Sequence, residues 1–542
     1  MNILGLGGSI HDFSACLTSG GEILHYIEEE RLLKIKHALN IGRKMVINKA
    51  AEYCLMESSL KESDLDAIVT TDIVEPAYYS RYSHHDIKII NHHLSHAASS
   101  FYPSPFHDAA ILVVDGRGSS IGEDAKETIS FYYGDGNQIQ ELKKSTGTEH
   151  NDLITNSLGC FYEEVTKAIG FEFLQDGKTM GLAPYGSDKY VDKFRDFFDM
   201  DDQGRFIQTV PQLHSLREFI IEEIHTSLDP EQCKANLAFA VQHHTEECLI
   251  NACLHLYHLT KSKNLCLSGG VALNSVANHK IAQHTPFENI YIFPAAGDAG
   301  TAIGCALYGY YALYDNPRIV KESATLCTPY LGKEYPQEAI KKAIDQHADE
   351  LIIQKPIDLN DYVSSLLADG KIIGWFQGRS EAGPRSLGNR SILADPRKHD
   401  MKDTINRRIK HRESFRPFAP AILEEHAQAY FSLQCLSPYM LFVADIIPSK
   451  RNQIPAVTHV DGTGRLQTVS KPMNPIFHSL LESFYHKTGV PILLNTSFND
   501  NGQPIIESPM DAVVTFLKLD LDYLVVGDYV LAKPDRSKEV EL

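Results

Sequence analysis

The chain has 542 residues, which is too many for one hydrophobic core, so its length predicts two or more domains. A composition of 43% hydrophobic and 22% charged residues excludes an intrinsically disordered chain. The formal net charge of −19 argues against a nucleic-acid partner, because phosphate contacts need a basic surface.

The hydropathy pattern predicts a cytoplasmic protein with no membrane partner. No apolar run approaches the ~20 residues of a membrane-spanning helix, and the start, MNILGLGG, lacks the basic segment of a signal peptide. The ten cysteines are scattered without a Cys-x-x-Cys pair, so we expect reduced core residues rather than disulfides or a thiolate metal site.

The first 30 residues predict a meander of three strands, NILGLGG, FSACLTSG and EILHYIEEE, joined by Gly-rich turns. His11 and Asp12 lie at the tip of the first turn, whose backbone N–H groups suit an anion. Lys36 lies just beyond the third strand. A helix is expected over residues 43–60, followed by a short strand, DAIVTT.

The stretch Asn91–Gly118 combines a histidine pair with a strand that ends on an acid. His92 and His96 are one helical turn apart, so a helix would direct both imidazoles to one point. The apolar run AAILVV delivers Asp115, and the later turn PAAGDAG offers Asp298. Two imidazoles and two carboxylates suit a borderline metal such as Zn²⁺ or Fe²⁺. Ordinary polar-face histidines are the alternative in a chain with 25 of them.

A second strand meander follows Asp115. VVDGRGSS resembles the first Gly-rich turn, and ETISFYYGDGNQIQELKK predicts a hairpin, so we expect a duplicated α/β unit. A later junction, SGGVALN, places Gly269, Gly270 and Asn274 at a strand's carboxyl end, where nucleotides bind in α/β sheets. The loop QDGKTMG is no P-loop, because residue 172 is Glu where that motif has Gly.

A second domain is expected after a composition shift between about Leu326 and Asp358. Its strands and intervening helices predict an α+β sheet. The expected strands are KIIGWF, AILEE, YMLFVADII, VPILLNTSF and YLVVGDYVLA.

Basic residues concentrate in this second domain. From Arg379 to Arg416 there are eleven Lys or Arg and five acids, so this stretch carries +6 and the rest of the chain −25. Because these residues alternate with Gly, Pro and Phe, a pocket for an anionic ligand is favoured over an exposed helix.

Ten motifs resemble, in order, the O-carbamoyltransferases of nodulation and antibiotic biosynthesis: HDFSA, HHLSHAASSFYPSPF, VDGRG, SLGCFY, GKTMGLAPYG, SGGVALN, GDAG, GPRSLGNRSILADPR, KHRESFRPFAP and LLNTSFN. The resemblance spans nearly the whole chain. It implies an N-terminal duplicated ASKHA domain (actin-like, ribonuclease-H-like) over 1–345 and a C-terminal YrdC-like domain over 346–542, hence an α/β plus α+β protein. Relatives often have a bulky residue where this chain has Ala382, and this difference is expected to affect substrate fit rather than the chemistry.

The resemblance also implies a two-step reaction in secondary metabolism. Carbamoyl phosphate loses its phosphate, and the carbamate attacks ATP, with Mg²⁺, to give carbamoyl-adenylate and pyrophosphate in the C-terminal domain. A small-molecule hydroxyl acceptor, a natural product or a sugar, then takes the carbamoyl group in the N-terminal domain. The metal there is expected to be Fe²⁺ or another divalent transition metal.

Residue roles follow from the same resemblance. His11 is the expected base or substrate-orienting group, Lys36 would stabilise charge on the adenylate, and Lys410 and Arg412 form the KxR signature of the synthase. The expected substrate or nucleotide ligands are Asp12, Lys178, Gly269, Gly270, Asn274, Arg385, Arg416, Ser497 and Asn499. The expected metal ligands are His92, His96, Asp115 and Asp298.

Four alternatives remain open at this point. An ASKHA-fold kinase or ATPase would share the Gly-rich turns but has no need for four metal ligands. A tRNA threonylcarbamoyl transferase shares the HxxxH pattern, although the charge of −19 opposes tRNA. A hydrogenase-maturation carbamoyltransferase would carry zinc-finger Cys pairs, and a non-catalytic binding module would release no pyrophosphate. The sequence names neither the acceptor nor the oligomeric state, and a homodimer is left open.

Overall fold

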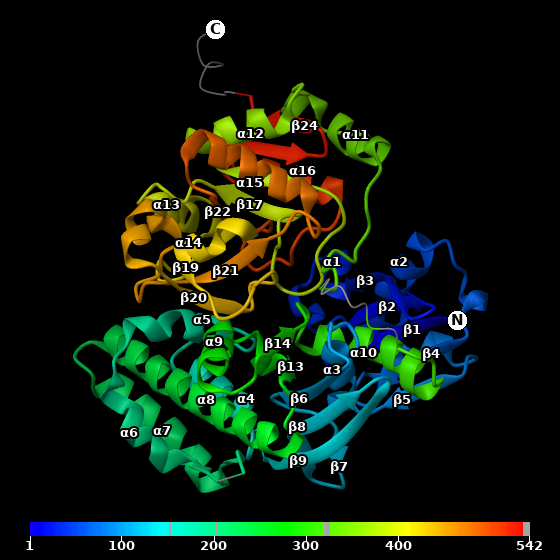
Figure 1. Cartoon of the computed structure of the whole chain (residues 1–542), viewed down its shortest axis with the longest axis vertical. Helices are drawn as coiled ribbons and strands as arrows, with labels where there is room; N and C mark the ends of the chain where they lie inside the picture. The colour runs from blue at the N-terminus through cyan, green and yellow to red at the C-terminus, as the bar shows by residue number, and fades with distance from the viewer. Residues whose placement is uncertain (151–152, 202, 319, 321–325, 535–542) are drawn as a thin grey trace. The chain divides into compact units, whose positions relative to one another are not determined.

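The computed structural model describes residues 1–150, 153–201, 203–318, 320 and 326–534, which form two compact units (Figure 1). Unit 1 contains Met1–Glu29 and Ala38–Cys327. Unit 2 contains Glu30–His37 and the chain from Thr328 onward. Each unit has its own sheets and its own buried core.

The first sheet of unit 1 has the strand order β3-β2-β1-β4-β5. The first three strands form the predicted antiparallel meander, and the last two run parallel to β1. The strands are β1 (Asn2–Gly7), β2 (Ser14–Ser19), β3 (Glu22–Glu28), β4 (Ala67–Thr71) and β5 (Ile87–Ile90).

The second sheet repeats this arrangement in the order β10-β9-β8-β6-β13-β14, with β7 (Ser120–Ile121) beside β8. Again an antiparallel meander is followed by two strands parallel to its first member, which confirms the predicted duplication. The strands are β6 (Asp108–Val114), β8 (Ala125–Asp135), β9 (Gln138–His150), β10 (Leu153–Ile154), β13 (Asn264–Ser268) and β14 (Asn289–Ile292).

Two corresponding helices follow the last strand of each repeat and pack against each other. They are α3 (His92–Phe101) after β5 and α10 (Thr301–Tyr308) after β14. Their backbones approach so closely that a Cβ on Gly304 would lie 1.8 Å from the carbonyl oxygen of Ser95. Consequently α3 is buried along most of its length.

The expected helix over 43–60 is interrupted. A 3₁₀ turn at Gly42–Val46 precedes α2 (Lys49–Glu57), and Asn48 between them has a φ of +48°. The Asn48 side chain caps α2 by accepting a hydrogen bond from the Ala51 N–H and donates to the Tyr78 carbonyl oxygen. This tertiary contact outweighs the continuous helical pattern of the sequence.

Unit 2 is built on a ten-stranded mixed sheet of order β15-β24-β23-β16-β17-β22-β18-β21-β20-β19. All five predicted strands are present, although the last is a hairpin, β23/β24, turning at Gly527. The strands are β15 (Ile352–Gln354), β16 (Ile373–Phe376), β17 (Arg390–Ala394), β18 (Ala419–Leu423), β19 (Phe431–Ser432), β20 (Phe442–Ile446), β21 (Thr463–Val469), β22 (Ile492–Ser497), β23 (Tyr523–Val526) and β24 (Tyr529–Ala532).

Helices cover both faces of this sheet. On one face, α12 (Leu359–Ala368) and α15 (Pro475–Thr488) pack around Trp375. On the other, α11 (Gln337–Asp345) and α16 (Pro509–Lys518) pack in the core that contains Phe376. Adjacent strand residues thus enter opposite cores, as the alternation of side chains along a strand requires.

The boundary between the units differs from the expected position at 345/346. It lies at Cys327/Thr328, because α11 packs against α16 of unit 2. The segment Glu30–His37 also belongs to unit 2 rather than to the first domain. Arg31 donates a 2.7 Å hydrogen bond to the Gly383 carbonyl oxygen, and Lys34 forms an ion pair with Asp511.

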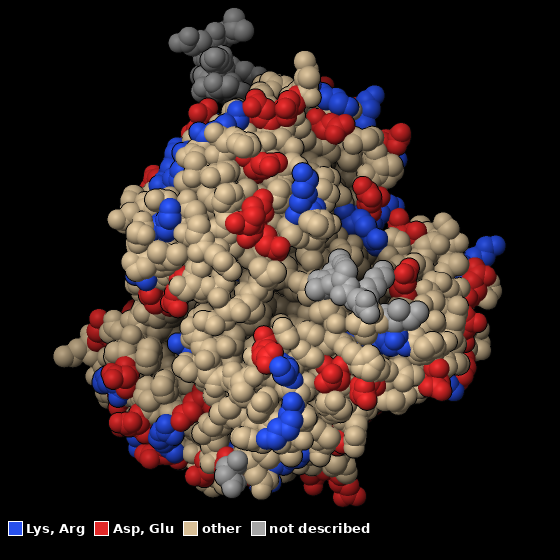
Figure 2. Space-filling model, in the orientation of Figure 1, with Lys and Arg blue, Asp and Glu red and all other residues tan. Residues whose placement is uncertain are grey.

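Charged groups of both signs are interspersed on the face shown in Figure 2, as expected for 51 basic and 70 acidic residues in one chain. Among the described residues, no helix is both long and apolar enough to cross a bilayer.

Candidate metal centre and anion-binding cluster

The four predicted metal ligands come together in unit 1, and all are buried. Asp115 follows β6, and Asp298 lies in the turn after β14. Because β6, β13 and β14 are parallel, their carboxyl ends meet at one edge of the sheet. His92 and His96 reach this edge from α3, which begins where Asn91 accepts a capping hydrogen bond from the Leu94 N–H.

The donor atoms of this group are spaced as ligands of one cation. His92 Nε2 and His96 Nε2 are 3.1 Å apart. Distances from the two Nε2 atoms to the nearest oxygens of Asp115 and Asp298 range from 3.2 to 3.6 Å. Bonds of ~2.1 Å give ligand separations of about 3.0 Å in an octahedron and about 3.4 Å in a tetrahedron. The residues therefore fit a divalent transition metal.

Electrostatics around these ligands explain how four polar groups share one buried site. Burial opposes the charge on His92, but hydrogen bonds to Asp115 and Asp298 outweigh it and raise its pKa to about 10. Burial likewise opposes ionisation of Asp115, yet the hydrogen bonds from His92 and His96 lower its pKa. Both shifts show that the carboxylates favour positive charge at this position, which is the charge that a bound cation would supply.

A hydrogen-bond chain orients His96. Its Nδ1 lies 3.3 Å from Ser268 Oγ, and Ser268 Oγ donates to the Ala296 carbonyl oxygen at 3.3 Å. The hydroxyl can therefore accept from Nδ1–H, which leaves Nε2 directed at the metal group. The sequence placed Ser268 at the end of β13 beside Gly269 and Gly270 but gave it no role as a support for His96.

His11 and Asp12 form a hydrogen-bonded pair, with His11 Nδ1 3.0 Å from Asp12 Oδ2. Burial lowers the pKa of His11, but the bond to Asp12 and the charges of Asp298 and Asp115 outweigh this effect and raise it to about 9. The imidazole therefore favours its protonated form at neutral pH in this environment.

Two glycines that were predicted as ligands also lie near the four metal ligands. Gly270 N–H donates a 3.2 Å hydrogen bond to Asp115 Oδ1. Gly269 adopts a φ of +92° against β6, where a Cβ would be 2.2 Å from the Val114 carbonyl oxygen. Asn274 instead caps α9 (Ser275–His284), and Lys178 Nζ lies 5.4 Å from the Phe171 ring centroid.

In unit 2, the predicted basic residues gather at one edge of the ten-stranded sheet. Arg385 precedes β17, Lys410 and Arg412 precede β18, and Ser497 ends β22. Since β22 is antiparallel to both β17 and β18, its carboxyl end meets their amino ends. Sheet topology therefore brings together segments up to about a hundred residues apart.

Lys410 lies at the centre of this edge and is buried. Its Nζ donates to the Ser497 carbonyl oxygen at 2.6 Å and to the carbonyl and side-chain oxygens of Asn499 at 3.1 and 2.7 Å. Burial lowers the pKa of Lys410 well below its usual value, and Arg412 adds to this shift. The three acceptors oppose the shift, because an ammonium group donates three hydrogen bonds and a neutral amine two.

Arginines crowd the same edge and raise its positive charge. Burial, with Arg416 nearby, lowers the pKa of Arg412 to about 9 and that of Arg385 to about 10. Both guanidinium groups remain charged at neutral pH. Lys36, from the inserted segment Glu30–His37, adds a further positive charge that acts on Lys410.

Arg465 on β21 joins this group, although we did not predict it from the sequence. Burial and the charges of Arg385, Arg412 and Arg416 lower its pKa. The Nε atoms of Arg465 and Arg385 are both buried without a hydrogen-bond partner. The signal was a charged residue inside the strand TGRLQTV, between two buried neighbours. We call Arg385, Lys410, Arg412, Arg416 and Arg465 the basic cluster.

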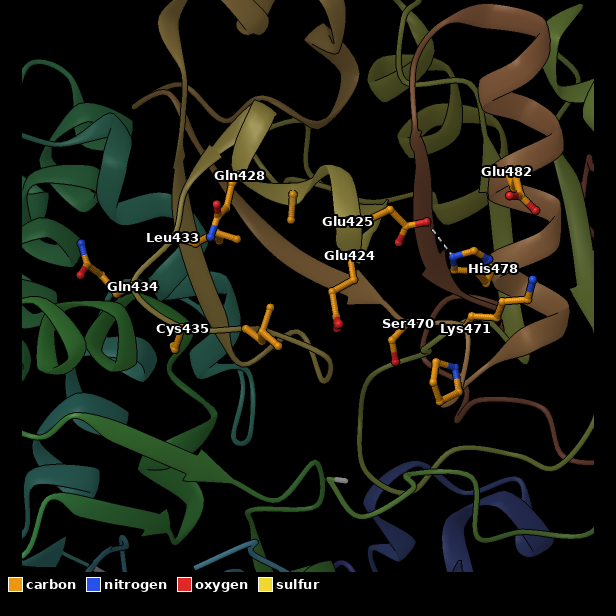
Figure 3. A pocket seen from close by; sticks show the side chains of 13 residues that line it. Glu424, Glu425, Gln428, Leu433, Gln434, Cys435, Ser470, Lys471, His478 and Glu482 are labelled. Carbon is orange, nitrogen blue, oxygen red and sulfur yellow. Dashed lines mark hydrogen bonds and ion pairs between the residues drawn. The ribbon is translucent and has the colours of Figure 1, made fainter. Parts of the chain in front are cut away.

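A cavity of about 830 Å³ lies at the opposite edge of the same sheet (Figure 3). Its lining includes Glu424, which follows β18, and Ser470, which follows β21. Five residues of β18 span about 16 Å at ~3.3 Å per residue, which separates this cavity from the basic cluster. None of the predicted site residues lines it.

Two family models match the chain. Residues 73–307 match the model described as carbamoyltransferase N-terminus, and residues 364–533 match carbamoyltransferase C-terminus. The chain belongs to the carbamoyltransferase family. It is therefore a transferase enzyme, as the sequence motifs predicted.

Relatives of this carbamoyltransferase come from several bacteria. Nodulation protein NolNO of Sinorhizobium fredii is 36% identical over 98% of the chain and 80% of its own length. An uncharacterized protein of Synechocystis, sll1178, is 34% identical over 99% and 98%. The 3'-hydroxymethylcephem-O-carbamoyltransferase of Amycolatopsis lactamdurans is 35% identical over 49% of the chain and 48% of its own length.

Among solved structures, full-length HypF in its phosphate- and nucleotide-bound form matches 58% of this carbamoyltransferase and 55% of its own chain. The identity is 13% and the TM-score 0.38, so this likeness carries no argument about the site.

Proposed function

We propose that this carbamoyltransferase is an ATP-dependent O-carbamoyltransferase with two separate reaction sites. Unit 2 would make carbamoyl-adenylate from carbamoyl phosphate and ATP. Unit 1 would transfer the carbamoyl group to a hydroxyl of a small natural product or sugar. The relatives in nodulation and cephem modification support a hydroxylated small-molecule acceptor.

The observation that carries this proposal is the basic cluster. Five cationic side chains converge there, and burial lowers the pKa of each of them. Repulsion from neighbouring basic groups adds to the shift for all but Arg416. Such an arrangement is costly unless anions offset the charge. Carbamoyl phosphate and ATP are polyanions whose reaction with each other needs this compensation.

The chemistry at the basic cluster would run as follows. Water cleaves carbamoyl phosphate to carbamate and phosphate. A carbamate oxygen then attacks the α-phosphorus of ATP, and the bond to the bridging oxygen of pyrophosphate breaks. The guanidinium groups would hold the phosphates. Lys410, which contacts Ser497 and Asn499, would be protonated when the anions bind and would offset charge on the attacked phosphorus. ATP is expected to enter with Mg²⁺.

In unit 1, the acceptor oxygen would attack the carbamoyl carbon, and the bond to AMP would break. A divalent cation bound by the two histidines and two aspartates would polarise the carbamoyl carbonyl. Fe²⁺ remains the prediction for this cation. His11 would take the hydroxyl proton. Because Asp298 and Asp115 raise its pKa, neutralising these carboxylates would lower it toward the range of a general base.

The fold supports the same division of labour. The duplicated strand order of unit 1 is that expected of an ASKHA domain, and the mixed sheet of unit 2 carries the KxR and SxN residues of a YrdC-like synthase. We propose these two fold relationships on the strand order and the motifs together.

Two variants test the proposal. Lys410→Ala should abolish pyrophosphate release from ATP and carbamoyl phosphate, but it should retain carbamoylation when carbamoyl-adenylate is supplied. His92→Ala should show the opposite behaviour. Pyrophosphate release and mass spectrometry over a panel of hydroxylated metabolites measure the two half-reactions.

Lys398→Ala serves as the matched control, because Lys398 lies on the surface of unit 2 and its Nζ contacts only the Asp369 carbonyl oxygen among the hydrogen bonds described. If Lys410→Ala and His92→Ala each remove both half-reactions while circular dichroism shows a folded chain, the two sites are not separable.

A further inference from the structure

A second group of metal-ligating side chains lies in unit 1, away from the metal centre. Glu62 is in the 3₁₀ turn before β4, and His84 and His85 are in the turn before β5. The Nε2 atoms of His84 and His85 lie 3.0 and 3.3 Å from the same oxygen, Glu62 Oε1. The ring centroids of the two histidines are 4.4 Å apart.

The distances from the two histidine nitrogens to Glu62 Oε1 are close to the ligand separations of a tetrahedral zinc site, and one donor atom from each of the three residues lies within 4.8 Å of the other two. Zn²⁺ bonds of ~2.0–2.1 Å to imidazole and carboxylate give ligand separations of about 3.4 Å. The Nε2 atom of His85 is also buried without a hydrogen bond of acceptable geometry, although Glu62 is close. A cation between the three residues would satisfy this nitrogen. His84 is 65% exposed, so water would have access to the fourth position.

The surroundings leave this group available to a cation. Arg81 lies in the turn before His84 and is held by an ion pair with Glu52 at 2.7 Å and a hydrogen bond to the Ile47 carbonyl oxygen. Lys88 pairs with Asp86 at 2.9 Å. The charge of Glu62 raises the pKa of Arg81, but the ion pairs described for Glu62 are those with the two histidines.

The group is far from the catalytic ligands along the sheet. Glu62, His84 and His85 precede the parallel strands β4 and β5, so they lie at the amino ends of both. His92 follows the carboxyl end of β5. The four residues of β5 span about 13 Å at ~3.3 Å per residue. β5 is the outer strand of its sheet and leads directly into α3, which carries His92 and His96.

We propose that Glu62, His84 and His85 bind a borderline divalent cation, and we take Zn²⁺ as the ion for the test. The bound cation joins the turn before β4 to the turn before β5 and so fixes the edge strand that leads into α3. Two imidazoles and one carboxylate favour Zn²⁺, Cu²⁺ or Ni²⁺ over Mg²⁺ or Ca²⁺, which prefer oxygen ligands. The site has a structural role and takes no part in carbamoyl transfer.

The experiment compares zinc content after saturation of the full chain with Zn²⁺ and removal of the excess by gel filtration. His84→Ala should hold one equivalent less than the wild type. So should Glu62→Gln, which keeps the size and shape of the side chain but removes the charge and replaces one carboxylate oxygen with an NH₂ donor. The zinc-dependent rise in melting temperature should fall in both variants. Circular dichroism and carbamoyl transfer should match the wild type.

His107→Ala is the matched control, because His107 pairs with Asp135 at 3.3 Å on the surface and has no second histidine in that pair. It should hold as much zinc as the wild type. The difference in zinc content between the wild type and His84→Ala reports on this site even if the catalytic centre holds no metal. A negative result here would therefore leave the proposed function untouched. Equal zinc content in wild type, His84→Ala and Glu62→Gln would overturn the proposal, as would an equal loss in His107→Ala.

Discussion

The Nδ1 atom of His96 lies 3.3 Å from the hydroxyl oxygen of Ser268, which is anchored in turn on the Ala296 carbonyl. Ser268→Ala should weaken metal binding by ~10–100-fold, because a ligand that loses its hydrogen-bonded support is less well oriented. Competition with a chelator measures the affinity.

Ser100→Ala is the control for this variant, because the Ser100 hydroxyl is buried on the same helix but donates only to carbonyl oxygens of α3. An unchanged affinity in Ser268→Ala would reduce Ser268 to a packing role.

Deleting a ligand should have a larger effect. His96→Ala should lower the content of bound transition metal by about one equivalent per chain, because three buried donors bind a cation less tightly than four. Elemental analysis of the purified variant, with His107→Ala as the exposed-histidine control, provides the measurement. Survival of both metal content and activity in His96→Ala would place the metal elsewhere.

Arg465 should prove necessary for the first half-reaction. Removing its guanidinium in Arg465→Ala should lower pyrophosphate release by ~10²–10³-fold, the effect of losing one preorganised donor to developing charge. Transfer from supplied carbamoyl-adenylate should persist. Arg451→Ala is the control, since Arg451 donates to the Ile446 carbonyl oxygen and lies outside the basic cluster. Equal rates in the two variants would exclude Arg465 from the site.

Anion binding to unit 2 should take up a proton. In the free chain the pKa of Lys410 is well below its usual value, and a bound phosphate would raise it. Between these two pKa values the free amine is neutral and the bound form is charged, so affinity should fall as pH rises through this window. Calorimetry of carbamoyl phosphate binding in buffers of different ionisation enthalpy measures the uptake.

The proton uptake should disappear in Lys410→Ala and remain in Lys398→Ala. A binding enthalpy independent of the buffer, measured on the wild type, would show that Lys410 is already protonated before the anion binds.

His11 should matter for transfer alone. His11→Asn should lower carbamoyl transfer by ~10²–10⁴-fold, as expected for the loss of a general base, while pyrophosphate release stays intact. If His11 acts as a base, transfer in the wild type should rise with pH as the imidazolium loses its proton. A rate that falls with rising pH would instead make His11 an acid, and near-normal turnover in His11→Asn would make it structural.

Much of the fold was predictable because local pattern and global structure agree. The apolar strand before Asp115 and the one-turn spacing of His92 and His96 specify where those side chains point, and the structure places them together. The duplicated meander was visible in two similar Gly-rich turns. The predicted start of the helix at residue 43 was wrong, and α2 begins at Lys49 instead. Asn48 adopts a left-handed conformation that is held by its contact with Tyr78, and hydrophobic periodicity does not reveal such a contact.

The rest of the site depended on contacts between distant segments. Arg465 and Arg385 come close to each other only because of the strand order of the ten-stranded sheet. Neither sequence motif predicts that order. The sequence predicted His11 as a base, but its pKa is raised to about 9, above the ordinary histidine value of 6.5, because Asp12, Asp298 and Asp115 surround a buried ring. Sequence spacing can identify candidate site residues, but it does not reveal the charged groups that surround them in the folded chain.

The placement of Glu30–His37 in unit 2 has a consequence for biosynthesis. Arg31 emerges from the ribosome early, yet its hydrogen-bond acceptor, Gly383, is 352 residues later in the chain. At ~5–20 residues per second, this interval is roughly 20–70 s. Unit 2 therefore cannot complete its structure from its own contiguous chain, and a fragment beginning at Thr328 would lack Arg31, Lys34 and Lys36. A permuted chain that fuses 30–37 to 328–542 would be needed to isolate it.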